Sequence, residues 1–184
     1  MEDRGAVSVI LGHSRIVARG FALFALTAFL ALARESPASA CTCMWAGGFL
    51  KVAPGAEVIV RVRVRDYHGQ ARKVHLAMDA VVLERLKGSP KADDIRIWGD
   101  NGILCRPYVS AFPRGTEWIL AIRPLSGPYG DEAGRAGDYY IPGCGAYWLR
   151  VNRDRVTGHI RDGAPGRAEQ ELSLDALRAA LTRH

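Results

Sequence analysis

Residues 57–66 of this 184-residue chain read Glu-Val-Ile-Val-Arg-Val-Arg-Val-Arg-Asp, and this stretch decides the fold. Its alternating positions are occupied by valine, at Val58, Val60, Val62 and Val64. The positions between them hold one isoleucine and then three arginines. A period of two predicts a β-strand with one buried side and one solvent-facing side. We therefore expect the arginines to face water and the valines to line a core.

Further strand signals follow this stretch. We expect strands over residues 74–86, 95–98, 116–122, 147–151 and 156–160. Residues 67–70 are expected to be a turn and 152–155 a hairpin, with 44–56 irregular and 161–169 a linker. Ser173 is expected to cap a final helix in which Leu174, Leu177 and Leu181 share one face. Five or six strands with one amphipathic C-terminal helix predict a mainly β protein, either a small closed barrel or a sandwich.

Residues 1–40 have the order of a secretory signal. Arg4, Arg15 and Arg19 precede an uncharged run from Phe21 to Ala33, and Ala38-Ser39-Ala40 forms an A-x-A cleavage site. The apolar run is shorter than the roughly 20 residues of a membrane-spanning helix. We expect cleavage after Ala40 and a secreted product, extracellular or periplasmic. An alternative is a lipoprotein anchored to a membrane at Cys41, but Ala38 stands where such proteins usually carry leucine, so we favour the free form.

The charge distribution and the missing catalytic motifs argue against a nucleic-acid-binding protein and against an enzyme. The chain carries 25 basic and 19 acidic residues, and the basic ones are scattered without an aromatic-basic platform, so nucleic-acid binding is not expected. No histidine pair of metalloprotease type, no G-x-S-x-G and no phosphate-binding glycine loop occurs. We therefore predict neither an enzyme nor a bound cofactor, and we expect a monomer.

Four cysteines follow the cleavage site: Cys41, Cys43, Cys105 and Cys144. An even number in an exported chain indicates two disulfides. Bonding Cys41 to Cys43 would close a strained, very small ring. Two crossing pairings remain, each joining the N-terminal pair to the two distant cysteines.

These features together resemble the N-terminal, netrin-like domain of the tissue inhibitors of metalloproteinases. The resemblance rests on Cys41-Thr42-Cys43 after the cleavage site, the strand that begins at Glu57, the F-x-x-G sequence Phe112-Pro113-Arg114-Gly115, and the two later cysteines. It covers residues 41–160, and residues 161–184 follow as linker and helix. A third disulfide and a second, disulfide-rich domain, both typical of the family, are absent from the sequence, so the chain resembles a minimal single-domain member.

The resemblance implies a five-stranded OB-type barrel with disulfides Cys41–Cys105 and Cys43–Cys144. It also implies a function, the inhibition of a zinc metalloproteinase through the new N-terminus. A free α-amine has a pKa of about 7.7–8.0, so part of it is neutral near pH 7. The amine and the carbonyl of Cys41 would then chelate the catalytic zinc of the target protease.

In that mechanism Thr42 enters the specificity pocket of the protease, and Cys43, Met44 and Trp45 extend the contact. The two disulfides hold the terminus still and so remove the entropic cost of ordering it. The alternative is a non-inhibitory netrin-like module that binds another extracellular protein. Cys41 and Cys43 would then only fasten the N-terminus to the barrel.

Overall fold

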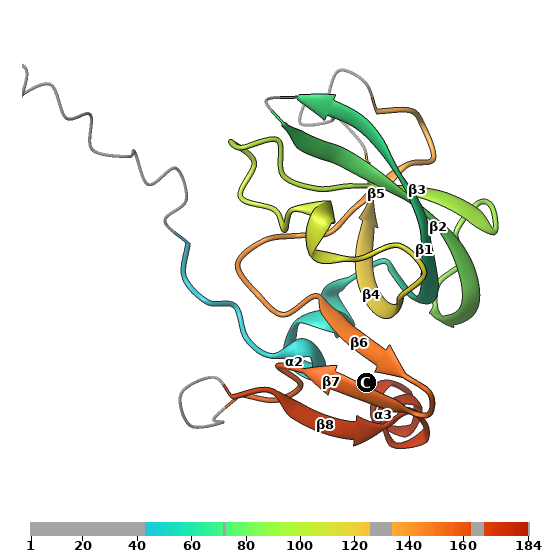
Figure 1. The fold of residues 1–184 in the computed structure, drawn as a ribbon. Coiled ribbons are helices and arrows are strands. Elements are labelled where there is room, and N and C mark those ends of the chain that lie inside the picture. Colours follow the sequence, from blue (N-terminus) through green and yellow to red (C-terminus); the bar gives the residue numbers. More distant parts are fainter. Residues whose placement is uncertain (1–42, 72, 126–133, 163–167, 184) are drawn as a thin grey trace, which may run out of the picture. The chain divides into compact units, whose positions relative to one another are not determined.

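The structure is a computed structural model, and it describes residues 43–71, 73–125, 134–162 and 168–183. Within them the elements follow the order α2 (Phe49–Val52), η1 (Ala53–Gly55), β1 (Val58–Ala71), β2 (Val74–Lys87), β3 (Asp94–Trp98), η2 (Val109–Ala111), β4 (Glu117–Pro124), β5 (Tyr139–Tyr140), β6 (Trp148–Asn152), β7 (Arg155–Gly158), β8 (Gln170–Ser173) and α3 (Leu174–Leu181). The predicted mainly β class and the C-terminal helix are confirmed (Figure 1).

Five strands close into a barrel. Their order is β1-β2-β3-β5-β4, and a further pairing between β1 and β4 joins the two ends of that series. All contacts in the ring are antiparallel except the one between β3 and β5, which is parallel. A closed ring leaves no barrel edge exposed to unwanted pairing. The predicted OB-fold-like, five-stranded barrel is therefore confirmed, and the sandwich is excluded.

The length and irregularity of β1 make the closure possible. The N-terminal part of β1, residues 58–63, pairs with β4. Almost the whole length of β1 pairs with β2. Its register with β2 shifts three times, between Ile59 and Val60, between Arg61 and Val62, and between Val64 and Asp66. Such bulges bend a strand and increase its twist. The four alternating valines of β1 are buried in the barrel core, as predicted.

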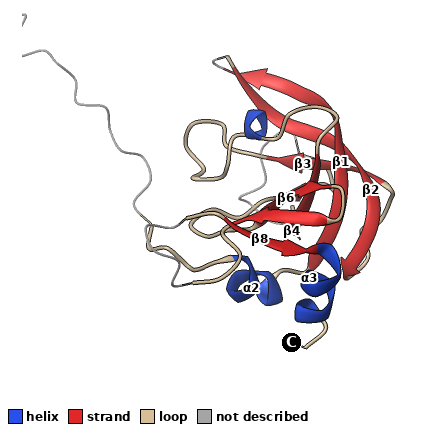
Figure 2. Cartoon of the chain, turned by 60° about the horizontal axis from the view of Figure 1, so that its bottom comes forward, coloured by secondary structure: helices blue, strands red, loops and turns tan. Residues whose placement is uncertain are grey.

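The strands β6, β7 and β8 extend the sheet from β4, beyond the barrel. One side of this extension carries Leu149, Val151 and Val156, which are buried in a second apolar cluster. Residues of α2 and α3, among them Phe49 and Leu177, complete that cluster. Figure 2 shows both helices on the same side of these strands. The second core thus attaches the N-terminal segment and the C-terminal helix to one sheet.

Two side-chain contacts fix α3. The Oγ of Ser173 accepts a hydrogen bond from the backbone N–H of Ala176 at 3.2 Å, so the predicted N-cap is confirmed. Arg178 donates two hydrogen bonds of 2.8 Å each to the carboxylate of Glu84 on β2. Leu174 and Leu177 are buried, and Leu181 packs against the same cluster. The predicted apolar face is therefore the one that meets the sheet.

Three local predictions were wrong. Residues 67–70 are not a turn, because β1 continues to Ala71 and the chain reverses only before Val74. Residues 44–56 are not irregular throughout, since they contain α2 and η1. Two short strands were not predicted at all: β5, which pairs with β3 and β4, and β8, which pairs with β7. In each case tertiary pairing or packing overrode a local signal from glycine or polar residues.

Candidate functional site

The predicted contact segment is only partly described. Cys41 and Thr42, and with them the predicted zinc-chelating amine, lie outside the described residues. Cys43 is described and forms a disulfide with Cys144, with a Cα–Cα distance of 5.7 Å. This bond joins positions 101 residues apart, and it is one of the two predicted disulfides. The segment that follows the predicted N-terminus is therefore covalently attached to the loop between β5 and β6.

Backbone hydrogen bonds hold the next residues. The N–H of Ala46 donates to the carbonyl oxygen of Cys144 at 2.6 Å, and the N–H of Ala146 donates to the carbonyl oxygen of Gly47 at 3.0 Å. The N–H of Gly48 donates to Asp162 Oδ1 at 2.7 Å. The chain from Cys43 to Gly48 is thus fastened at both ends, which limits the conformations open to Met44 and Trp45 between them.

The contacts at the start of α2 lower the pKa of the Asp162 carboxyl group. The hydrogen bond from the Gly48 N–H and the ion pair with Lys51, whose Nζ lies 3.1 Å away, hold the pKa of Asp162 below its usual value of 3.8. The ionised form of Asp162 is therefore favoured where the segment joins α2. Both charged side chains are partly exposed, so the contribution to stability is small.

The loop that carries Cys105 is organised by one buried acid. Asp100 lies at the end of β3, and its carboxylate accepts hydrogen bonds from the backbone N–H of Gly102 and, at 3.0 Å, from that of Arg106. The N–H of Asp100 in turn donates to the carbonyl oxygen of Pro107 at 3.1 Å. These bonds close residues 100–107 into a compact loop.

Cys105 itself is disulfide-bonded. Its predicted partner, Cys41, lies outside the described residues, so the pairing Cys41–Cys105 stays a prediction. Cys105 and Cys144 have φ angles of 55° and 68°, in the left-handed region that residues other than glycine seldom adopt. Such strain persists only where the surroundings over-determine the backbone. The two loops that carry the bonded cysteines are thus tightly constrained.

Large apolar side chains are exposed on these segments. Met44 is 92% exposed and Trp45 39%, and on the Cys105 loop Ile103 is 64% and Tyr108 46% exposed. Trp45 also makes an edge-to-face contact with His159, with ring centroids 5.8 Å apart. Exposed apolar side chains on rigid backbone are favourable contacts for a protein partner, because little entropy is lost when they are buried. Ile103 and Tyr108 were not predicted as contacts.

Two further properties of the described residues concern metal binding and membrane-spanning helices. Across 43–71, 73–125, 134–162 and 168–183, no group of three or more His, Cys, Asp or Glu side chains is placed to hold a metal ion. In the same ranges no helix is long and apolar enough to cross a membrane.

No protein-family model and no curated protein matches the chain.

Proposed function

We propose that the protein is an exported inhibitor of zinc metalloproteinases, similar to the netrin-like domain of the tissue inhibitors of metalloproteinases. The observation that carries the proposal is the attachment of Cys43 to Cys144, which leaves Met44 almost fully exposed on a fastened segment. The closed OB-fold-like barrel supports it as well, since the resemblance implies that fold.

The mechanism depends on two residues that precede this segment. Cleavage after Ala40 makes Cys41 the first residue, and its amine and carbonyl chelate the catalytic zinc of the protease in place of the water that occupies the open coordination position. Thr42 then enters the specificity pocket. Cys43 is already fixed to the barrel, so the terminus loses less freedom on binding than an unattached one would.

The described surface extends this contact. Met44 and Trp45 continue from the terminus, and Ile103 and Tyr108 come from the loop of Cys105, which the proposed Cys41–Cys105 disulfide brings alongside. The protease is then held by apolar contacts on both sides of the zinc-binding terminus. The existing disulfide agrees with an oxidising, extracellular or periplasmic location.

An inhibition assay tests the proposal. The mature protein beginning with Cys41 is titrated against purified zinc metalloproteinases of the His-Glu-x-x-His type, beside a variant with one alanine added before Cys41. We expect inhibition by the first and at least a hundredfold weaker inhibition, or about 2.7 kcal/mol, by the second. A matched control carries the added alanine after His184. Equal inhibition by all three proteins would contradict the mechanism.

The second candidate is a non-inhibitory extracellular binding module. Ile103 and Tyr108 favour it, because these side chains are exposed whatever the state of the N-terminal amine. This function predicts that acetylation of the Cys41 amine leaves partner binding unchanged. A large loss of binding on acetylation would favour the inhibitor instead.

A further inference from the structure

A second surface lies on the sheet extension, on the side opposite α2 and α3. Along β6 and β7 the side chains alternate, so Leu149, Val151 and Val156 enter the core and their neighbours face outward. One row on this face crosses four strands through directly paired positions, from Trp118, which is buried at the barrel core, to Arg150, Thr157 and Glu171. At about 4.8 Å between strands the row is roughly 14 Å long, which suits an elongated ligand.

Two adjoining hollows lie over this row. The first has a volume of about 400 Å³ and includes Trp45, Trp118, Trp148 and His159 among its lining residues. The second has a volume of about 530 Å³ and is lined only by polar and charged residues. Both are lined by Arg150 and Thr157, so they adjoin each other, and we call the two together the β6–β7 groove.

The aromatic end holds three of the four tryptophans of the chain. Trp118 is buried, whereas Trp45 and Trp148 keep part of their indole rings accessible. Trp148 packs edge-to-face on Phe112, with ring centroids 5.9 Å apart, so its orientation is fixed. A fixed, partly exposed indole offers a flat apolar face beside an N–H donor.

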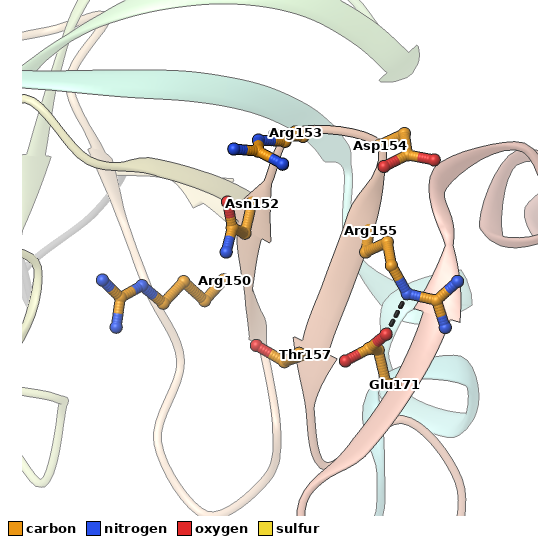
Figure 3. A pocket seen from close by; sticks show the side chains of 7 residues that line it. All are labelled: Arg150, Asn152, Arg153, Asp154, Arg155, Thr157 and Glu171. Atoms are coloured by element: carbon orange, nitrogen blue, oxygen red, sulfur yellow. Dashed lines mark hydrogen bonds and ion pairs between the residues drawn. The ribbon is translucent and has the colours of Figure 1, made fainter.

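The polar end presents donors and acceptors in balance. Figure 3 shows Arg150, Asn152 and Arg153 on one side and the ion pair between Arg155 and Glu171 on the other. Three guanidinium groups line the groove, and three carboxylates match them: Asp154, Glu169 and Glu171. Within the described ranges, Arg150, Arg153, Asp154 and Glu169 form no ion pair with one another or with other residues.

We propose that the β6–β7 groove binds a neutral oligosaccharide. Each sugar hydroxyl donates and accepts a hydrogen bond, so a row of sugar rings satisfies arginine, asparagine and carboxylate groups together, and the apolar face of a ring packs on an indole. A polyanion would meet three carboxylates and a polycation three guanidinium groups. Within the groove a peptide could not add as a strand, because β6 and β7 are paired along both edges; among these strands of the extension, only the outer edge of β8 is unpaired.

This site is separate from the proposed protease contact, with which it shares only Trp45. Arg150 and Asn152 are exposed and belong to the groove alone. Substituting them is therefore expected to leave the fold and metalloproteinase inhibition unchanged. The two proposals can accordingly fail independently of each other.

The test is a binding titration of the full mature protein with maltohexaose, cellohexaose and chitohexaose, followed by calorimetry and by tryptophan fluorescence. We expect one of these sugars to bind and to shift the emission of the groove tryptophans. Arg150→Ala and Asn152→Ala should each weaken binding about tenfold, because each removes hydrogen bonds to the ligand. Arg183→Ala, an exposed arginine outside the groove, is the matched control and should bind as the unmodified protein does.

Three outcomes would overturn the proposal. The first is that none of the three sugars binds at millimolar concentration. The second is that binding is as tight in Arg150→Ala as in Arg183→Ala. The third is that a hexagalacturonate or a casein peptide mixture binds more tightly than every neutral sugar, which would assign the groove to an acidic glycan or to a peptide.

Discussion

Gly143 lies against the carbonyl oxygen of Cys105, so closely that a Cβ atom on Gly143 would stand 1.8 Å from that oxygen. The contact joins the two loops that carry the disulfide-bonded cysteines Cys105 and Cys144. Real Cβ atoms do not approach a backbone oxygen so nearly, so only glycine fits without movement of one loop. The relative placement of the two loops thus depends on the absence of a side chain at Gly143.

Gly143→Ala should therefore destabilise the protein by at least about 2 kcal/mol, because backbone must shift to admit the methyl group. Thermal unfolding followed by circular dichroism measures the effect. Gly55→Ala is the control, since the nearest atom to its added Cβ is the end of the Arg123 side chain at 4.0 Å. A melting temperature for Gly143→Ala equal to that of Gly55→Ala would contradict the close contact.

Asp100→Asn should loosen the Cys105 loop. The amide that replaces one carboxylate oxygen cannot accept a hydrogen bond at its nitrogen, so the backbone N–H of Gly102 or Arg106 loses its partner at a cost of about 1–3 kcal/mol. Chemical denaturation and limited proteolysis at Arg106 give the readouts. Asp93→Asn, which removes only an exposed ion pair with Arg85, should cost less than about 1 kcal/mol. Equal stability of the two variants would argue against the role given to Asp100.

Glu84 makes the attachment of α3 depend on pH. The hydrogen bonds from Arg178 hold the pKa of Glu84 below its usual value of 4.5. Since the folded pKa is lowered, the stabilisation is present above pH 4.5 and is lost as the pH falls through the folded pKa. Glu84→Gln should cost about 0.5–1 kcal/mol at pH 7, and its difference from the unmodified protein should vanish in acid.

Chemical denaturation between pH 7 and pH 3 measures the difference in unfolding free energy between Glu84→Gln and the unmodified protein. Asp175→Asn is the control, because Asp175 contacts the same Arg178 but is 91% exposed, and its loss should change stability by about 0.3 kcal/mol. The account of Glu84 fails if the cost of Glu84→Gln stays constant over the whole pH range.

Replacing Cys43 and Cys144 together by serine should destabilise the protein by about 2–5 kcal/mol, because their bond closes a loop of 101 residues. The segment from Met44 to Gly47 should also gain freedom, since it loses its covalent attachment to the Cys144 loop. Hydrogen exchange at Ala46, whose N–H donates to the Cys144 carbonyl, measures that change. Unchanged protection of Ala46 would show that the disulfide does not restrain the segment.

The sequence predicts the strands better than it predicts the residues of the candidate binding surfaces. The valine alternation of β1 and the hairpin at residues 152–155 are local patterns, and both are confirmed. Residues 67–70 misled the prediction because Gly69 and its polar neighbours favour a turn, yet β2 pairs with them through His68 and Gln70. The strand β8 is four residues long and forms only because β7 is beside it.

In the candidate sites, too, some features could be predicted from the sequence and others could not. The Cys43–Cys144 bond belongs to the pairing that the family resemblance implies. Asp100, Gly143 and the tryptophans of the β6–β7 groove carry no motif, and their roles depend on contacts between residues far apart in the chain. An acid two residues after a strand and a glycine directly before a cysteine are the only signals that would have pointed to the first two.

The central claim is a free Cys41 terminus that two disulfides hold in place. Mass spectrometry of the exported protein after tryptic digestion without reduction tests it most directly. The account predicts a peptide of residues 41–51 with an unmodified amine, linked through Cys41 to the peptide of Cys105 and through Cys43 to the peptide of Cys144. A peptide that begins before Cys41, or an acyl group on Cys41, would contradict it.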